Sequence, residues 1–226
     1  PEHVDLENAL GDYFMYYKPK DAVSGDFPWL YERDDYTYIA AVDCTGHGVP
    51  GAMMSLIGHL LLNDIVNNTK SYKTPGEILN ELHHAVVSTL KQDAPGNKAA
   101  DGMDVAICRI SKDQKEVLYA GAHRPLYKLV EGEHEVIQYK GSKYPIGGMQ
   151  YSGENNFEDQ KVDVVEGDQI FFFSDGLPDQ FGGPDNRKLG PKRIRRLIEE
   201  NKGKSMDEFN VLFENHFMEW MGDGKQ

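Results

Sequence analysis

The sequence predicts an α+β layered sandwich, with antiparallel β-sheets at its centre and helices outside. Segments rich in β-branched and aromatic residues alternate in blocks with segments whose apolar residues recur at helical spacing. Their order is strand block, helix pair, strand block, helix pair, which is typical of this class. The chain has 226 residues, 39% of them hydrophobic, so it can bury one substantial core. We therefore expect a single domain over residues 1–226.

The chain opens with a predicted β meander. Its segments are rich in Tyr, Ile and Val and are separated by Gly25, Pro28 and the Asp34-Asp35 turn. Three strands are expected, at Tyr13–Lys18, Trp29–Arg33 and Tyr36–Val42.

A pair of helices is expected next. From Gly51 onward, apolar residues recur at helical spacing and predict a buried helix that ends near Asn67-Asn68. The residues that carry this spacing are Met53, Leu56, Ile57, Leu60 and Leu61. We interpret Met53, Met54 and Met103 as core residues rather than as an adaptable partner surface. The second helix is predicted from Thr74-Pro75-Gly76-Glu77, which supplies an N-cap, a first-turn proline and a glutamate at the third helical position.

The second half returns to strands and ends with two more helices. Turn-forming pairs such as Glu131-Gly132 and Glu166-Gly167 separate the strands. Strands are expected at Met103–Ile110, Val117–Ala122, Leu126–Val130, Glu135–Tyr139 and Gln169–Phe173. The helices are Pro191–Glu200 and a segment that starts with the capping pair Ser205 and Glu208.

Composition excludes several classes of protein. Lys and Arg number 24 against 37 Asp and Glu, a net charge of −13, which argues against a general nucleic-acid surface or an anionic membrane partner. The two cysteines, Cys44 and Cys108, have no CxxC spacing and predict neither a disulfide framework nor a structural zinc site. A cytoplasmic location is the simplest expectation. No signal peptide is visible, and the uncharged window Cys44–Asn63 contains glycines and Pro50, which favours a turn and buried helix over a membrane span.

Four acidic residues stand next to glycine and are the candidates for chemistry: Asp26 in VSGDF, Asp43 in VDCTGHG, Asp101 in ADGMD and Asp175 in FSDGL. Each pair taken alone is common in turns. Asp43 and Asp175, however, each follow a strongly apolar strand, where a charged group needs a partner. A Mg²⁺ or Mn²⁺ ion held by carboxylates, carbonyls and water supplies one. We therefore predict that these two aspartates bind metal.

Five motifs together indicate a family. VSGDF, VDCTGHGVPGAMMS, GMDVAI, YAGAHRPL and SDGLPDQFGG occur in this order between about Tyr13 and Gly222. The combination resembles the bacterial SpoIIE/RsbU-like branch of the metal-dependent PPM protein serine/threonine phosphatases. This resemblance implies an αββα sandwich of two antiparallel sheets between helical layers, with a two-metal site at one edge. It also implies hydrolysis of phosphoserine or phosphothreonine on a bacterial signalling protein.

The resemblance assigns roles to individual residues. Asp43 is similar to the aspartate that bridges both metals, and Cys44 to the residue that offers its backbone carbonyl to one of them. Asp26 resembles the first acidic position near the metals, directly bound or bound through water, and Asp175 resembles a ligand of the second metal. Asp43 and Asp26 are thus the expected catalytic residues. Two Mn²⁺ or Mg²⁺ ions are expected in the complete domain, where they would activate a water for in-line attack on phosphorus.

One part of the family pattern is missing. Relatives carry a Gln-x-Asp-Asp segment after the last helix, and no such segment occurs before Gln226. We therefore expect residues 1–226 to be excised from a longer multidomain protein and to lack its C-terminal strand. The resemblance implies an N-terminal sensor or coiled-coil region in the parent chain and a phosphorylated protein substrate, such as an anti-sigma factor antagonist. A homodimer is compatible with it, whereas contact with nucleic acid or membrane is not expected.

Other residues of the motifs have competing interpretations. His47 is interpreted as structural because its spacing from Asp43 differs from the Asp-Gly-His-Gly of eukaryotic relatives, and a general acid is the alternative. His123 is also interpreted as structural. Lys20 is interpreted as a solvated surface residue, with attraction of phosphate as the alternative, and Asp101 is a candidate for a third metal site. The segment Pro184–Lys188 is hypothesised to be a mobile flap.

Two other functions stay open. The first is a pseudophosphatase or protein-binding signalling module with a degenerate metal site. The second is a phosphohydrolase that acts on a small molecule. Metal-dependent turnover of a phosphopeptide distinguishes the proposed enzyme from both.

Overall fold

The computed structural model describes residues 1, 3–68, 71–96, 100–133, 135–148 and 156–222. The chain divides into two compact units. The larger unit comprises Pro19–Leu126 and Tyr139–Val164, and the smaller unit comprises Pro1–Lys18, Tyr127–Gln138 and Val165–Gln226. The expectation of a single domain over residues 1–226 stays a prediction.

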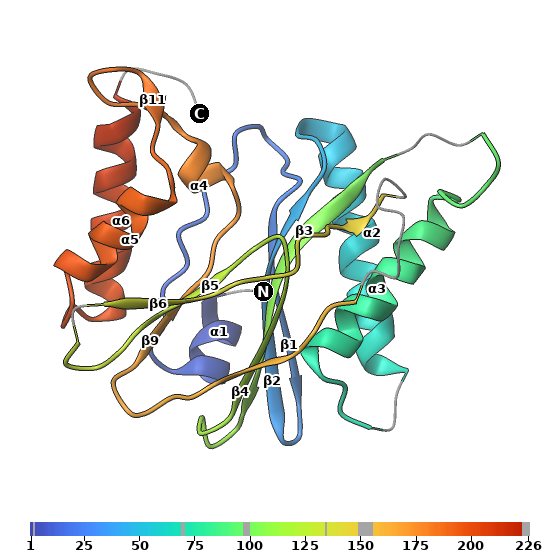
Figure 1. Ribbon diagram of the computed structural model, residues 1–226, viewed down its shortest axis with the longest axis horizontal. Helices are drawn as coiled ribbons and strands as arrows, with labels where there is room; N and C mark the ends of the chain where they lie inside the picture. The colour runs from blue at the N-terminus through green and yellow to red at the C-terminus, as the bar shows by residue number, and fades with distance from the viewer. Residues whose placement is uncertain (2, 69–70, 97–99, 134, 149–155, 223–226) are drawn as a thin grey trace. The chain divides into compact units, whose positions relative to one another are not determined.

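The larger unit is an antiparallel sheet with two helices on one face (Figure 1). The strand order is β1-β2-β3-β4-β8, and β7 pairs with β3. The strands are β1 Phe27–Arg33, β2 Tyr36–Cys44, β3 Gly102–Ser111, β4 Val117–Ala122, β7 Ile146–Gly147 and β8 Gln160–Val162. The helices are α2 Gly48–Asn67 and α3 Pro75–Thr89. Each predicted strand and helix of this part is confirmed within a few residues, and β7 and β8 are additional.

Helix α2 is only half buried, which corrects part of the prediction. Its inner face packs on the core through Gly51, Met54, Gly58, Leu62 and Val66. The outer face exposes Val49, Met53, Leu56 and Leu60, each more than half accessible. Met54 and Met103 are core residues as predicted, but Met53 is not. The reason is that both faces of α2 are apolar in sequence, whereas only one face meets the sheet and α3.

Among the described residues, α2 alone is long and apolar enough to cross a membrane by length and composition. Helices that pack in a protein core pass the same test, and α2 contributes five buried residues to this unit.

The start of α3 follows the sequence signal closely. The Thr74 hydroxyl accepts a hydrogen bond from the Glu77 amide, and the Glu77 carboxylate accepts one from the Thr74 amide. This capping box satisfies two of the amide groups that the first turn of a helix leaves without partners. Ile78, Leu82 and Val86 are fully buried, so the predicted apolar stripe faces the core.

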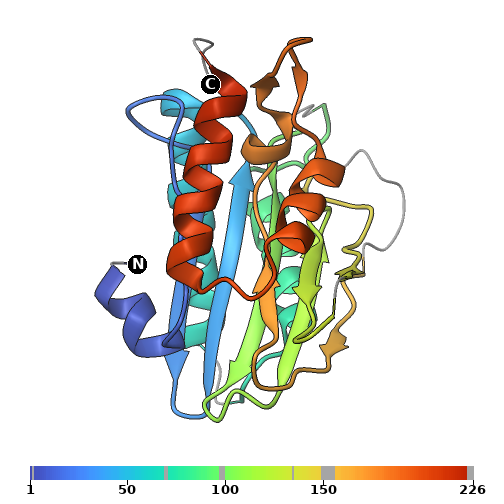
Figure 2. The ribbon, with the colours of Figure 1, turned by 90° about the vertical axis from the view of Figure 1, so that its left-hand side faces the viewer.

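The smaller unit has a three-stranded sheet in the order β6-β5-β9. The strands are β5 Leu126–Leu129, β6 Val136–Tyr139 and β9 Gln169–Phe171, and β10 Phe181–Gly182 forms a hairpin with β11 Arg187–Lys188. The helices are α1 His3–Leu10, α4 Gly176–Asp179, α5 Pro191–Glu200 and α6 Met206–Met221. Helices α5 and α6 lie beside each other (Figure 2) and pack Ile194, Ile198, Phe209 and Phe213 against sheet residues such as Phe171. Ser205 and Glu208 form the predicted capping box.

Two segments of the smaller unit differ from expectation. Tyr13–Lys18 does not form a strand. Two of its aromatic residues instead pack on α6, since the ring of Phe14 lies 5.5 Å from that of Phe213 and the ring of Tyr16 lies 5.6 Å from that of Phe217. Aromatic content thus reflected burial rather than strand pairing. The segment Pro184–Lys188 closes the β10–β11 hairpin, and its role as a flap stays a prediction.

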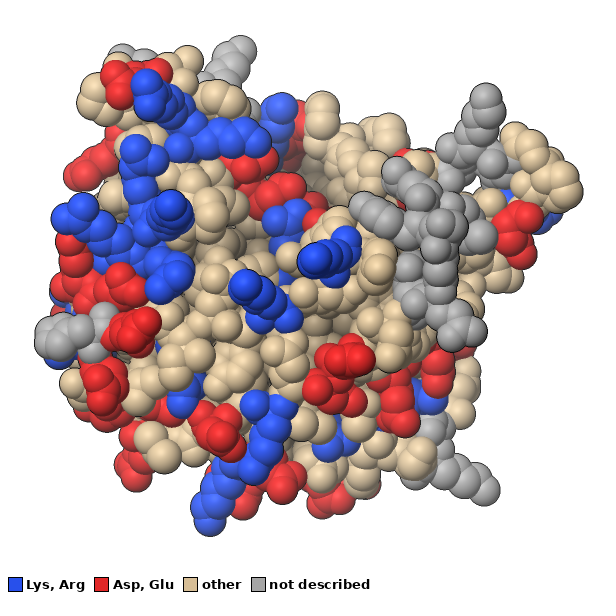
Figure 3. Space-filling model, in the orientation of Figure 1, with Lys and Arg blue, Asp and Glu red and all other residues tan. Residues whose placement is uncertain are grey.

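Charge is unevenly distributed over the surface. Basic side chains gather over α5 and β11 (Figure 3), although the whole chain has a net charge of −13. Part of this positive charge is locally neutralised, because Arg195 and Arg196 form ion pairs with Glu199 and Glu200 one helical turn away.

Candidate metal site

Asp43 lies at the end of β2, on the face of the sheet that α2 and α3 do not cover. Along β2, Ala40, Val42 and Cys44 belong to the core cluster with these helices. Because side chains alternate between the two faces of a strand, Asp43 points to the opposite face. Its side chain is 13% exposed, so the carboxylate is largely withdrawn from water and requires a cationic partner.

Cys44 presents its side chain to the core and not to a ligand. The residue is 3% exposed. Burial, with the nearby carboxylates of Asp43 and Asp26, raises the pKa of the Cys44 thiol to about 12. Because the thiol packs in the core cluster, the backbone carbonyl is the donor that Cys44 can offer at this end of the sheet.

Asp26 reaches the same end of the sheet from the neighbouring strand. Phe27, the first residue of β1, is paired with Val42, and this register brings Asp26 beside Asp43. The amide of Asp26 donates a hydrogen bond of 3.0 Å to the hydroxyl of Ser24, and the hydroxyl of Ser55 in α2 donates to the Ser24 carbonyl at 3.2 Å. The loop that carries Asp26 is therefore fastened to α2 through Ser55.

The turn after β2 requires glycine for steric reasons. Gly46 and Gly48 have φ values of 89° and 61°, in the left-handed region that favours glycine. A Cβ atom on Gly51 would lie 2.4 Å from the Gly46 carbonyl oxygen. Thr45 fastens the turn to β3, since its hydroxyl accepts a hydrogen bond from the Gly102 amide at 3.1 Å and its amide donates one to the Gly102 carbonyl at 2.9 Å.

Two residues that sequence reasoning missed complete this end of the sheet. Asp104 is the register partner of Asp43 across β2 and β3, and Arg124 follows β4. The Arg124 guanidinium lies 3.0 Å from the Asp43 carboxylate and 2.8 Å from the Asp104 carboxylate. A signal was available, because Asp104 interrupts the apolar run of GMDVAI.

His123 has a structural place beside this ion pair. Its Nδ1 lies 3.0 Å from an Asp104 carboxylate oxygen and its Nε2 contacts the Lys143 carbonyl. These contacts agree with the structural interpretation of His123. His47 lies 3.0 Å from Asp21 through Nδ1, and both side chains are exposed. Its role as a general acid stays an untested alternative.

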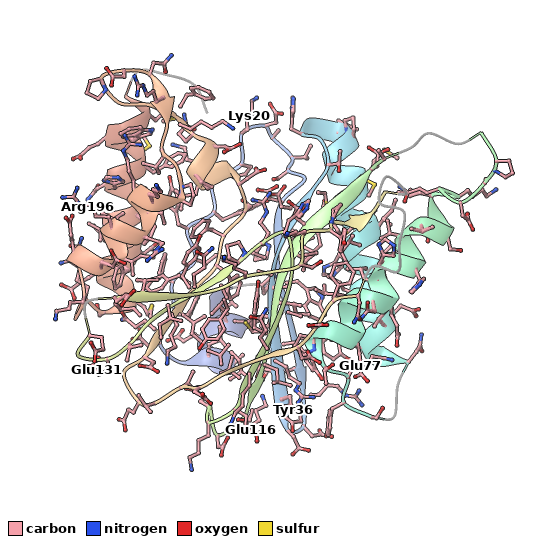
Figure 4. All side chains as sticks on the ribbon, in the orientation of Figure 1. Lys20, Tyr36, Glu77, Glu116, Glu131 and Arg196 are labelled. Atoms are coloured by element: carbon pink, nitrogen blue, oxygen red, sulfur yellow. The ribbon has the colours of Figure 1, made fainter. Side chains whose placement is uncertain are left out.

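The structure gives no contact between the remaining candidates and Asp43 among the interactions of the described residues. Asp175 belongs to the smaller unit, where it is the N-cap of α4. Asp101 is exposed, and its carbonyl accepts a hydrogen bond of 2.6 Å from Gln92. Lys20 is exposed on the loop before β1 (Figure 4). The Gln-x-Asp-Asp segment expected in the parent chain stays a prediction, and residues 223–226 lie outside the described residues.

The donor chemistry of the larger unit fits a hard divalent cation. Asp43 and Asp26 supply carboxylates and Cys44 supplies a carbonyl, and Mg²⁺ and Mn²⁺ prefer such oxygen ligands. The glycine packing around Gly25 leaves the Cys44 carbonyl without a covering side chain on that side, since a Cβ there would lie 3.1 Å from it. Across the described part of the chain, no three His, Cys, Asp or Glu side chains converge as a metal cluster.

Comparison with known families gave one match. The model described as Stage II sporulation protein E (SpoIIE) matches residues 33–226. Comparison with curated proteins gave no match.

Solved structures with the same fold include several phosphatase domains. The SiaA-PP2C domain of Pseudomonas aeruginosa is 28% identical, with a TM-score of 0.86, over 99% of this chain and 85% of that one. The PP2C phosphatase domain of SpoIIE from Bacillus subtilis, with a fragment of its regulatory domain, is 19% identical with a TM-score of 0.66, over 92% and 56%. The RsbU and RsbW domains of a Mycobacterium tuberculosis protein are 21% identical with a TM-score of 0.65, and the match covers 88% of this chain and 51% of that one. This chain spans about half the length of the last two. The predicted α+β fold class is confirmed.

Proposed function

Because this chain belongs to the SpoIIE family of PP2C-type phosphatase domains, we propose that it hydrolyses phosphoserine or phosphothreonine on a signalling protein. Family membership supports phosphatase chemistry, and the finer statement about substrate is our inference. We further propose that the reaction depends on Mn²⁺ or Mg²⁺ and takes place in the cytoplasm.

The oxygen-donor set at one end of the larger sheet carries this proposal. Asp43 and Asp26 would hold the cation through carboxylates and Cys44 through its carbonyl. When bound, such cations lower the pKa of coordinated water and neutralise phosphoryl oxygens. The residues themselves supply the orientation, because the chain segments at Gly25, Gly46 and Gly51 lie so close together that no side chain fits between them.

The nature of the substrate is supported by one matched relative. The Mycobacterium tuberculosis structure contains an RsbW domain together with its RsbU domain. We therefore propose a phosphorylated regulatory protein, such as an anti-sigma factor antagonist, as the substrate of this chain.

The proposal is tested by phosphate release. The wild-type protein is incubated with a phosphoserine or phosphothreonine peptide and with p-nitrophenyl phosphate, with Mn²⁺ or with EDTA. We expect metal-dependent release from the peptide, and loss of most of this activity in Asp43→Asn and Asp26→Asn. Asp113→Asn is the matched control, because Asp113 is an exposed residue in the turn at the far end of β3, and it should retain full activity.

Other outcomes favour the alternative functions. Release from p-nitrophenyl phosphate alone favours a small-molecule phosphohydrolase. No release from either substrate, with the phosphopeptide still bound, favours a pseudophosphatase or binding module. Unchanged activity of Asp43→Asn would show that the site lies elsewhere.

A further inference from the structure

One guanidinium group is shared by two carboxylates at the candidate metal site. Arg124 lies 3.0 Å from the Oδ2 atom of Asp43 and 2.8 Å from the Oδ2 atom of Asp104. The three side chains are 17%, 13% and 19% exposed, respectively. Water therefore screens this group only weakly, and each ion pair is stronger than a surface pair would be.

The strand register explains why a cation is required there. Asp43 and Asp104 face each other across β2 and β3, and directly opposed side chains of paired strands have Cβ atoms only about 5 Å apart. Two like charges at that separation destabilise the pair of strands. The positive charge of Arg124 offsets this repulsion.

The position of Arg124 is itself tightly built. The Arg124 amide donates a hydrogen bond of 2.7 Å to the Ala122 carbonyl, and the Arg124 carbonyl accepts one from the Tyr119 hydroxyl. His123 adopts a φ of 59°, which is uncommon for a residue with a side chain and persists only where the surroundings enforce it. A Cβ atom on Gly121 would lie 2.3 Å from the Arg124 carbonyl oxygen. The turn thus holds the guanidinium between the two carboxylates.

This arrangement has a consequence for cation binding at Asp43. A divalent ion on that carboxylate would be close to the positive charge of Arg124 and would compete with it for the same group. Asp43 and Asp104 together with Arg124 have a net charge of −1, whereas replacement of Arg124 by a neutral residue leaves −2. The field at Asp43 therefore becomes more favourable for a dication when Arg124 is removed.

We propose that Arg124 is a positioning residue that sets the cation affinity of the site. In the metal-free protein its guanidinium neutralises Asp43 and Asp104 together. When a cation is bound, Asp43 would serve it as a ligand, and Asp104 would be the carboxylate left to Arg124. The inference rests on the metal site of the proposed function. It adds that Arg124 lowers the affinity of this site for a divalent cation.

The test measures Mn²⁺ binding directly, by the loss of the electron paramagnetic resonance signal of free Mn²⁺. Arg124→Gln should bind Mn²⁺ at least about tenfold more tightly than wild type. Without metal it should melt at a lower temperature, and its melting temperature should rise more than that of wild type when Mn²⁺ is added. A purely structural role predicts the lower melting temperature but no gain in affinity. An unchanged or weaker Mn²⁺ affinity of folded Arg124→Gln would overturn the inference.

A second variant should change the Mn²⁺ affinity in the opposite direction, and it keeps the test valid if Arg124→Gln fails to fold. Asp104→Asn leaves Asp43 as the remaining carboxylate of this pair and removes one negative charge, so it should weaken Mn²⁺ binding. Tighter or unchanged binding in Asp104→Asn contradicts the inference. Arg195→Gln, which removes a guanidinium paired with Glu199 on α5, is the matched control and should leave Mn²⁺ binding unchanged.

The same titrations separate this inference from the proposed function. If wild type binds Mn²⁺ through Asp43 and Arg124→Gln gains nothing, only the role of Arg124 is wrong. If neither protein binds Mn²⁺, or if Asp43→Asn/Arg124→Gln binds as tightly as Arg124→Gln, the metal site at Asp43 is wrong as well.

Discussion

Gly25 lies so close to Gly46 that a Cβ atom on Gly25 would stand 2.6 Å from the carbonyl oxygen of Gly46. Real Cβ atoms do not approach backbone oxygens to that distance, so the loop before β1 and the turn after β2 can meet only through glycine. This contact fixes Asp26 and the Cys44 carbonyl at the same end of the sheet.

Gly25→Ala should therefore disturb both stability and metal binding. Because the atom in the way is backbone, the two segments must move apart, and such overpacking costs about 1–3 kcal/mol of unfolding free energy. We also expect weaker Mn²⁺ binding, since Asp26 and the Cys44 carbonyl would be displaced. Denaturant unfolding and Mn²⁺ titration measure the two effects.

Gly58→Ala is the matched control for this variant. Gly58 is a buried helical glycine, and a Cβ there would meet the flexible end of Met103 at 3.0 Å, which can give way. This variant should lose less stability and bind Mn²⁺ normally. Equal stability and equal Mn²⁺ affinity in the two variants would contradict the packing argument.

The smaller unit should depend on a buried ion pair. The Lys128 ammonium lies 2.8 Å from Asp168, and their side chains are 8% and 1% exposed. The carboxylate also accepts hydrogen bonds from the amides of Glu131 and Val165. Asp168→Asn leaves the buried ammonium without its charged partner and should cost about 3–5 kcal/mol of unfolding free energy. Loss of a similar amount in Asp163→Asn, which affects an exposed pair with Lys161, would show that burial is not the cause.

The same pair predicts a dependence of stability on pH. Burial would raise the pKa of Asp168, but the hydrogen bonds from Lys128, Glu131 and Val165 and the Lys128 charge outweigh it, and the pKa lies below its usual value. The unfolded chain therefore takes up the proton first. The stabilisation is complete above the unfolded-state pKa of about 3.9 and is lost as the pH falls below it. Acid unfolding of Asp168→Asn should show a shallower slope in that range, and a slope equal to that of wild type would exclude this cause.

Both cysteines should be unreactive in the folded protein. Cys44 is 3% exposed and Cys108 is fully buried. Burial raises the pKa of both thiols, to about 12 for Cys44, where Asp43 and Asp26 contribute. The thiolate is the reactive form, so a thiol reagent such as 5,5′-dithiobis(2-nitrobenzoic acid) should label neither cysteine natively and both in urea. Rapid labelling of native protein would contradict this description.

The sequence predicted best those helices and strands whose ends are set by interactions between residues close together in the chain. The bounds of β4 and α5 match the expected Val117–Ala122 and Pro191–Glu200, and both capping boxes form at the predicted residues. These elements are specified by capping, proline placement and side-chain alternation, which act within a few residues. The two- and three-residue strands β7, β8, β10 and β11 were missed because such short segments show no periodicity.

The sequence pointed only to those residues of the candidate site that also carry a local signal. Asp26 and Asp43 stand beside glycine, and the register of β1 and β2 places them at one end of the sheet. Arg124 has no such signal, because it reaches Asp104 across 20 residues of sequence and only the paired strands bring the two together. The exposed face of α2 could not be predicted either, since apolar periodicity does not show how many faces of a helix pack against other elements.

His83 should be neutral in the folded state. Its Nδ1 atom accepts a hydrogen bond of 3.1 Å from the Gly147 amide, and a protonated nitrogen cannot accept one. Burial, and then the neighbouring His84, lower the pKa of His83. The unfolded chain therefore binds a proton before the folded one does, and stability falls as the pH drops below about 6.5, by up to about 1.4 kcal/mol per pH unit from this group. His83→Asn keeps an acceptor near the amide and cannot be protonated, so urea unfolding should show a smaller loss across this range. His59→Asn, at an exposed position, should retain the wild-type slope, and an unchanged slope in His83→Asn would assign the pH dependence to another group.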